Sequence, residues 1–188
     1  EHATTLLEML DWHVLTHPDR THIILSGEAA DDCMDAGGRA TQGAVAEEEI
    51  TYQALYAGAA SVAAGLQQQD LQPGQTVAIM LPTSRDYFYS FYGVLLAGGV
   101  PVPIYPPARL SQIEDHLRRH AGILANAQTS ILITVPEART VARLLKSQVE
   151  GLRAVATVAE LSATRQPLIR PVVKAQDIAL LQYTSGST

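Results

Sequence analysis

Short apolar runs that alternate with longer segments of helical pattern constrain the fold of this chain more than any other feature. The runs VAIML at 77–81 and SILIT at 130–134 are apolar at nearly every position, as strands covered on both faces should be. The segments between such runs begin or end at Pro, Gly or Ser. This alternation predicts an α/β fold in which helices flank a mostly parallel sheet.

Three further apolar runs carry more specific expectations. Pro101 and Pro103 in the run VPVPI cannot donate to a ladder, so this strand should lie at a sheet edge or lack part of its ladder. The run LRAVATV at 152–158 is predicted to be another strand. The run IALLQYT at 178–184 is predicted to be the last strand, buried on both faces.

Several helices are predicted from their start signals. Thr5 with Glu8, and Ser111 with Glu114, have the spacing of capping boxes. Ser84 can cap the segment that follows it, because its hydroxyl can accept a hydrogen bond from a free backbone N–H in the first turn. The buried face of the first helix is expected to consist of Leu6, Leu10 and Val14.

Composition excludes several classes of function. The net charge is −6 and no basic cluster exists beyond Arg118–Arg119, so no nucleic-acid partner is expected. Cys33 is the single cysteine, which excludes an intrachain disulfide and any zinc site of several cysteines. No apolar run approaches the roughly 20 residues that span a bilayer, and the first residues lack the basic region of a signal peptide. We therefore expect a cytoplasmic protein without a membrane span.

The segment 28–49 differs from the rest of the chain. It is acidic, rich in Gly and Ala, and without periodicity, so we predict a mobile acidic surface loop. Cys33 lies within it, and no His or second Cys is near in the sequence. We interpret this cysteine as an exposed thiol without a function.

The run 178–184 continues directly into Ser185-Gly186-Ser187-Thr188. In an open parallel sheet, ligands bind beyond the carboxyl ends of strands, and a glycine there allows a ligand to approach the backbone. Consecutive N–H groups and hydroxyls in such a loop suit a polyphosphate, although a plain Ser/Thr/Gly turn fits the same composition. The patterns of a Walker A loop, a dinucleotide fingerprint and an esterase elbow are all absent.

The residues YTSGST at 183–188 resemble the start of the phosphate loop of adenylate-forming enzymes. This superfamily includes acyl-CoA synthetases, peptide-synthetase adenylation domains and luciferases. The order of the predicted elements is also similar, and the LPTS…YPP tract at 81–107 resembles the fatty acyl-AMP ligase branch. The resemblance covers nearly the whole chain apart from 28–49.

The resemblance implies that residues 1–188 are an N-terminal subdomain fragment of an adenylation domain, ending inside the phosphate loop. It implies ATP and Mg²⁺ as cofactors, a fatty acid as substrate, an acyl carrier protein or CoA as acceptor, and a C-terminal part of the same enzyme as partner. No catalytic or metal-binding residue is expected within the chain, which should be inactive alone. The residues expected to bind the ATP phosphates are Thr184, Ser185, Gly186, Ser187 and Thr188.

Three other functions stay open at this point. An acyl-CoA synthetase differs only in the acceptor, an amino-acid adenylation domain differs in the substrate, and a non-catalytic binding or scaffold module would lack the reaction. His116 and His120 have the spacing of a two-histidine metal face, but Arg118–Arg119 between them would repel a cation. The loop 105–107 could line a ligand cleft or serve only as loop architecture. Five aromatic residues at helical spacing are expected to pack in the core rather than to line an acyl or adenine pocket: Tyr87, Phe88, Tyr89, Phe91 and Tyr92.

Overall fold

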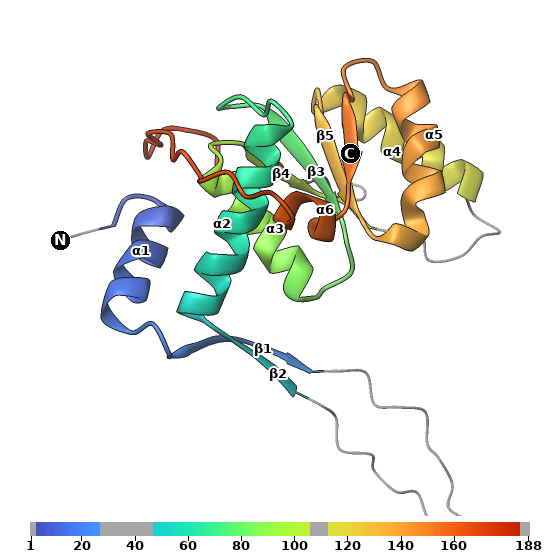
Figure 1. The fold of residues 1–188 in the computed structure, drawn as a ribbon. Coiled ribbons are helices and arrows are strands. Elements are labelled where there is room, and N and C mark those ends of the chain that lie inside the picture. The colour runs from blue at the N-terminus through green and yellow to red at the C-terminus, as the bar shows by residue number, and fades with distance from the viewer. Residues whose placement is uncertain (1–2, 27–46, 106–112, 185–188) are drawn as a thin grey trace, which may run out of the picture.

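The computed structural model describes residues 3–26, 47–105 and 113–184, without the side chains of 113–117. A four-stranded parallel sheet with the order β4-β3-β5-β6 lies between two layers of helices (Figure 1). A separate antiparallel pair, β1-β2, leads from the first helix into α2. The strands are β1 (Thr21–Ser26), β2 (Glu47–Thr51), β3 (Thr76–Met80), β4 (Val100–Pro103), β5 (Ile131–Thr134) and β6 (Ala154–Ala156). The predicted α/β class and parallel sheet are confirmed.

Six α-helices and one 3-10 turn are described. Two of them, α2 and α3, pack against each other on one side of the sheet, whereas α4 and α5 cover the other side (Figure 1). The helices are α1 (Leu6–Thr16), α2 (Tyr52–Gln68), α3 (Arg85–Leu96), α4 (Ile113–Asn126), α5 (Arg139–Gln148) and α6 (Val158–Ser162). The 3-10 turn Pro136–Ala138 precedes α5, and its proline lies in the first turn, where the missing N–H leaves no helical bond unmade. No helix of the described residues is long and apolar enough to cross a membrane.

The central strands have two buried faces because their side chains alternate between two cores. Ile131 and Ile133 of β5 belong to the cluster beneath α2 and α3, and Leu132 belongs to the cluster beneath α4 and α5. The side chains of β3 divide in the same way, with Val77 and Ile79 on the first side. This two-sided burial explains why the central strands are apolar at nearly every position rather than at alternate positions.

Local signals at the helix starts are confirmed in two places. Thr5 caps α1, and the reciprocal bonds with Glu8 complete the predicted capping box. Ser84 accepts a hydrogen bond from the N–H of Tyr87 and so caps α3. The expected box of Ser111 and Glu114 lies outside the described side chains.

The predicted buried face of α1 is wrong in one member. Leu6 is 43% exposed, whereas Leu7 and Leu10 are buried and Val14 is partly buried against the same core. Spacings of three and of four both keep residues on one helix face, so the sequence pattern fitted Leu6 as well as Leu7. Which of the two leucines is buried depends on which side of α1 packs against α2.

Two predicted boundaries also change. Glu47–Glu49, assigned to the acidic loop 28–49, form the first part of β2, where they pair with β1. The remaining loop residues 28–46, with Cys33, lie outside the described residues. Of the run 152–158, only Ala154–Ala156 form a strand, β6. Thr157 caps the short helix α6, which begins at Val158 and was not predicted.

The prediction that residues 178–184 form the last strand is wrong. Residues 178–184 form no strand, and Ile178 is 62% exposed although it was expected to be buried on both faces. Leu180 and Tyr183 are also exposed, while Leu181 packs against the core beneath α4 and α5. The apolar character of this run therefore predicted neither its conformation nor its burial.

Candidate phosphate-binding site

Thr184 is the one predicted phosphate-binding residue that the structure describes, and it is exposed. Ser185, Gly186, Ser187 and Thr188 lie outside the described residues, so their role stays a prediction. The structure does describe the segment that leads to them, 165–184, and its attachment to the domain. This attachment decides where the loop starts.

The outer edge of β4 presents backbone carbonyls but no N–H groups to the segment 165–184. The N–H groups of Val100 and Ile104 donate to the carbonyls of Gln75 and Ile79, at either end of β3, each at 2.9 Å. Alternation then directs the backbone of Pro101 and Pro103 outward, and neither has an N–H. The edge position predicted from these two prolines is confirmed.

Besides the packing of Leu181, two described hydrogen bonds attach residues 178–184 to β4 and α4. The N–H of Leu181 donates to the outward carbonyl of Pro101 at 3.1 Å. The hydroxyl of Tyr183 donates to Oδ1 of Asn126, the last residue of α4, at 2.5 Å. The second contact lies one residue before Thr184 and was not predicted, since nothing local in the sequence marks a lone helix-end asparagine as a partner.

Residues 165–177 form an irregular connection that crosses α2 and reaches α1. The Gln67 side chain donates to the carbonyl of Ile169 at 2.6 Å and accepts from its N–H at 3.0 Å, as a neighbouring strand would. Arg170 donates to both carboxylate oxygens of Asp11 at 2.9 Å. The Asp11 carboxylate raises the pKa of Arg170 above its usual value. Leu168 packs against the core beneath α2 and α3.

A cavity of about 630 Å³ in the described part of the chain does not coincide with the predicted site. It lies among the start of α1, residues 98–100 at the start of β4, and residues 171–179. This is the amino end of β4, whereas ligands of open parallel sheets bind beyond the carboxyl ends of strands. We therefore do not assign the cavity to the phosphate-binding site.

The structure also describes most of the other residues that the sequence singled out, namely the aromatic residues of α3, Tyr105 and His120. The tyrosines and phenylalanines of α3 pack in or against the core, as predicted. Burial of the Tyr87 side chain, and to a smaller extent the nearby Tyr105, raises the pKa of Tyr87. Tyr105 itself is 86% exposed, and the two prolines after it lie outside the described residues. His120 is buried, and the His116 side chain is not described. Within the described ranges, no three His, Cys, Asp or Glu residues could hold a metal ion.

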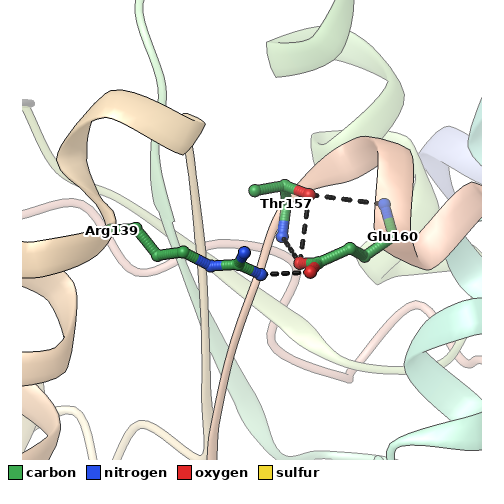
Figure 2. A network of polar contacts seen from close by, with 3 residues as sticks. All are labelled: Arg139, Thr157 and Glu160. Carbon is green, nitrogen blue, oxygen red and sulfur yellow. Dashed lines mark hydrogen bonds and ion pairs between the residues drawn. The ribbon is translucent and has the colours of Figure 1, made fainter.

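A polar network joins the start of α5 to α6 (Figure 2). Arg139 forms an ion pair with Glu160, whose other carboxylate oxygen accepts hydrogen bonds from the N–H and the hydroxyl of Thr157. These contacts, with the Arg139 bond the largest, lower the pKa of Glu160 to about 2. Every member has a partner within the network, so we interpret it as a structural connection and not as a reactive group.

Comparison with known proteins identifies the family. Residues 10–188 match the family model described as AMP-binding enzyme. The chain belongs to this family. The match covers nearly the whole chain, and it confirms the resemblance to adenylate-forming enzymes that the terminal loop suggested.

Relatives of two kinds are similar to this member of the family. The long-chain-fatty-acid–AMP ligase FadD32 of Mycobacterium marinum is 33% identical over 144 residues, which cover 76% of this chain and 22% of that protein. Gramicidin S synthase 2 of Brevibacillus brevis is 37% identical over 145 residues, which cover 75% of this chain and 3% of that protein. The chain thus spans about a fifth of the FadD32 relative's length and far less of the synthase.

A solved structure matches this chain over its full length. The fatty acyl-adenylate ligase of L. pneumophila, in complex with acyl adenylate and pyrophosphate, has a TM-score of 0.73 and 27% identity. The alignment covers 100% of this chain and 29% of the solved one. The shared fold therefore includes the segment 165–184, which has no regular secondary structure apart from its turns.

Proposed function

We propose that the full-length protein activates a fatty acid with ATP, releasing pyrophosphate and forming an acyl-adenylate. The observation that carries this proposal is the full-length structural match to a ligase whose complex holds acyl adenylate and pyrophosphate, the two products of that step. The relationship to two FadD32 fatty acid–AMP ligases supports the same substrate class. The family alone supports the coarser activity, adenylate formation.

In the proposed reaction a carboxylate oxygen of the fatty acid attacks the α-phosphorus of ATP. The bond between that phosphorus and the bridging oxygen to the β-phosphate breaks, and pyrophosphate leaves with the electron pair. Thr184, Ser185, Ser187 and Thr188 would donate hydrogen bonds to the phosphate oxygens, while Gly186 would allow close approach of the backbone. These donors hold the phosphates in line with the attacking carboxylate.

Mg²⁺ belongs to the proposal as an ion that neutralises phosphate charge when bound. The described residues provide no group of three suitable ligands, so we assign none of them to the ion. The described part of this chain would contribute neutral donors only, of which Thr184 is the exposed example.

The acceptor and the substrate class have named competitors. JamA of Moorena producens, a medium-chain-fatty-acid–[acyl-carrier-protein] ligase, is 27% identical over 143 residues, which supports a carrier protein as acceptor. A long-chain-fatty-acid–CoA ligase of Bacillus subtilis is 36% identical over 88 residues, which supports CoA. Gramicidin S synthase 2 keeps an amino acid as the second candidate substrate.

The test uses the full-length protein in ATP–pyrophosphate exchange with a fatty-acid series and an amino-acid series. We expect exchange with fatty acids and none with amino acids; the reverse pattern would overturn the fatty-acid assignment. Carrier protein and CoA are then supplied separately, and the acylated acceptor is identified by mass. An ATP titration without heat or fluorescence change would instead favour the scaffold function. The present chain alone is expected to release no pyrophosphate above a boiled control.

The phosphate loop has its own test in the full-length protein. Loss of one hydrogen bond to a charged group costs about 1.5–3 kcal/mol, so Thr188→Ala should lower adenylation roughly 10- to 150-fold. Gly186→Val should lower it further, because a β-branched residue resists positive φ and fills the space beside the phosphates. Ser147→Ala is the matched hydroxyl control, since Ser147 is exposed on α5 and bonds only the Leu144 carbonyl of its own helix. Unchanged circular dichroism would separate loss of binding from loss of fold.

A further inference from the structure

We propose that Asn126 is a positioning residue for the phosphate loop, acting through the hydroxyl of Tyr183. This inference rests on the proposed function, because it assigns a role to residues that hold the loop rather than touch the nucleotide. Tyr183 lies one residue before Thr184, and its hydroxyl donates to Asn126 Oδ1 at 2.5 Å. The bond joins the start of the loop to the end of α4.

The segment needs such a contact because the sheet edge beside it cannot hold it by a ladder. A strand added parallel to β4 would find the carbonyls of Pro101 and Pro103 as acceptors but no N–H donor on that edge. Residues 178–184 accordingly form no strand, and the N–H of Leu181 makes the one backbone bond to β4 that is described. Between Leu181 and the phosphate loop, the Tyr183 side chain takes over the attachment.

Asn126 is itself fixed on both sides along the chain. Leu124, two residues before it, is fully buried in the core beneath α4 and α5, and Ala127 after it is also buried. The Ala127 carbonyl accepts a hydrogen bond from the Thr76 hydroxyl of β3 at 2.8 Å. The helix end is thus tied to the central sheet, and a side chain placed there is a rigid reference point for a segment without regular structure.

The expected effect is specific to the nucleotide. Without the bond, the loop donors would sample more positions, so ATP would have to order the loop when it binds. A neutral hydrogen bond of this kind corresponds to a factor of about 3 to 10 in affinity. The ATP Kd and the ATP KM should rise by that factor, whereas the fatty-acid KM should change less than about twofold.

The experiment compares Tyr183→Phe, Asn126→Ala, their combination and Asn126→Asp in the full-length protein. Phenylalanine keeps the ring and removes the donor, alanine removes the acceptor, and aspartate keeps an acceptor oxygen at the same place. Gln148→Ala is the matched control, because Gln148 is likewise the last residue of its helix, α5, and is exposed. ATP Kd is measured by equilibrium dialysis, exchange kinetics give both KM values, and urea unfolding gives stability.

We expect both single variants to weaken ATP binding equally, the combination to add no further loss, and Asn126→Asp to restore most of the affinity. Wild-type ATP Kd in the single variants overturns the inference while leaving the proposed function intact. Additive losses, or equal losses in the ATP and fatty-acid KM, also overturn it and indicate a general structural effect. Fatty-acid exchange that is absent in a wild type that binds ATP overturns the proposed function, and the Kd values still decide the inference. A wild type that binds no ATP overturns both.

Discussion

The central strands and the segment 165–184 are held in opposite ways. All side chains of β3 and β5 are buried except that of Thr76, the first residue of β3. Each of the two strands is hydrogen-bonded to a neighbouring strand on both sides. In the segment, Ile169 and Val172 are largely exposed, and a few specific side chains make the attachments. The segment nevertheless leads directly into the predicted phosphate loop.

The difference separates two tasks that one chain must perform. Burial on two faces stabilises the sheet, and this stability is sensitive to any change in the volume of a core side chain, because the core is closely packed. Single hydrogen bonds contribute little to stability but determine where a strand-free segment lies. Substitutions in the sheet should therefore change unfolding, whereas those in the segment should change geometry at small cost in stability.

The largest effect is expected for the sheet. Ile133→Ala should lower the free energy of unfolding by about 2–5 kcal/mol, because Ile133 is fully buried in the middle of the parallel sheet. Ile178→Ala, the same substitution at a 62% exposed position of the segment, should cost less than about 0.5 kcal/mol. Urea unfolding of the two variants tests the contrast directly. Similar losses at the two positions would abolish the comparison.

A second prediction tests how tightly the sheet's helices are packed. A Cβ at Gly65 of α2 would lie 2.1 Å from the backbone oxygen of Leu161 in α6. Gly65→Ala should therefore destabilise the domain by about 1–3 kcal/mol, since two helix backbones would have to separate. Gly122→Ala in α4 is the control: nothing lies within 4 Å of its Cβ, so it should stabilise by about 0.5–1 kcal/mol. Equal signs for the two changes would contradict the packing argument.

The sequence predicted the parts of this molecule that local chemistry determines. Runs such as 130–134 indicated doubly buried strands, the prolines of VPVPI indicated a sheet edge, and Thr5 with Glu8 indicated a helix start. Each of these depends on the chemistry of a few neighbouring residues. The element order and the α/β class followed from them.

The failures depended on partners distant in sequence. Burial of 178–184 depends on what packs beside the outer edge of β4, which an apolar run does not specify. The short helix α6 was instead missed for a local reason: its five residues are too few to show a helical period, although Thr157 and Glu160 have the capping-box spacing that marks α1. Asn126 and Gln67 meet partners 57 and 102 residues away, and no local pattern marks either side chain.

A third prediction concerns the segment itself. Gln67→Ala removes both hydrogen bonds to Ile169 and should cost about 1–2 kcal/mol, because each neutral bond contributes about 0.5–1.5 kcal/mol. Hydrogen exchange of the Ile169 amide should accelerate, while that of β5 amides should change only by the global loss. Gln68→Ala, at the exposed neighbouring position of α2, is the control. Unchanged exchange at Ile169 would show that the segment is held by other contacts.

The smallest effect is expected at the connection between α5 and α6 (Figure 2). The pKa of Glu160 is lowered from 4.5 to about 2, chiefly by Arg139, so its contribution to stability is complete above about pH 4.5 and is lost as the pH falls toward 2. Both side chains are substantially exposed, so this contribution should not exceed about 1 kcal/mol. Glu160→Gln should remove that pH-dependent part of the unfolding free energy. The exposed Glu150→Gln is the control, and an identical acid profile in the two variants would contradict the assignment.

The prolines of β4 also affect the tendency of the protein to aggregate through its sheet edges. An open parallel sheet exposes two edges that could template strands of neighbouring chains and so initiate aggregation. On one edge, Pro101 and Pro103 remove the donors that an incoming strand would need. On the other, β6 has only three residues. Association of chains through backbone pairing is thus disfavoured at both edges, which directs any contact between molecules toward side chains.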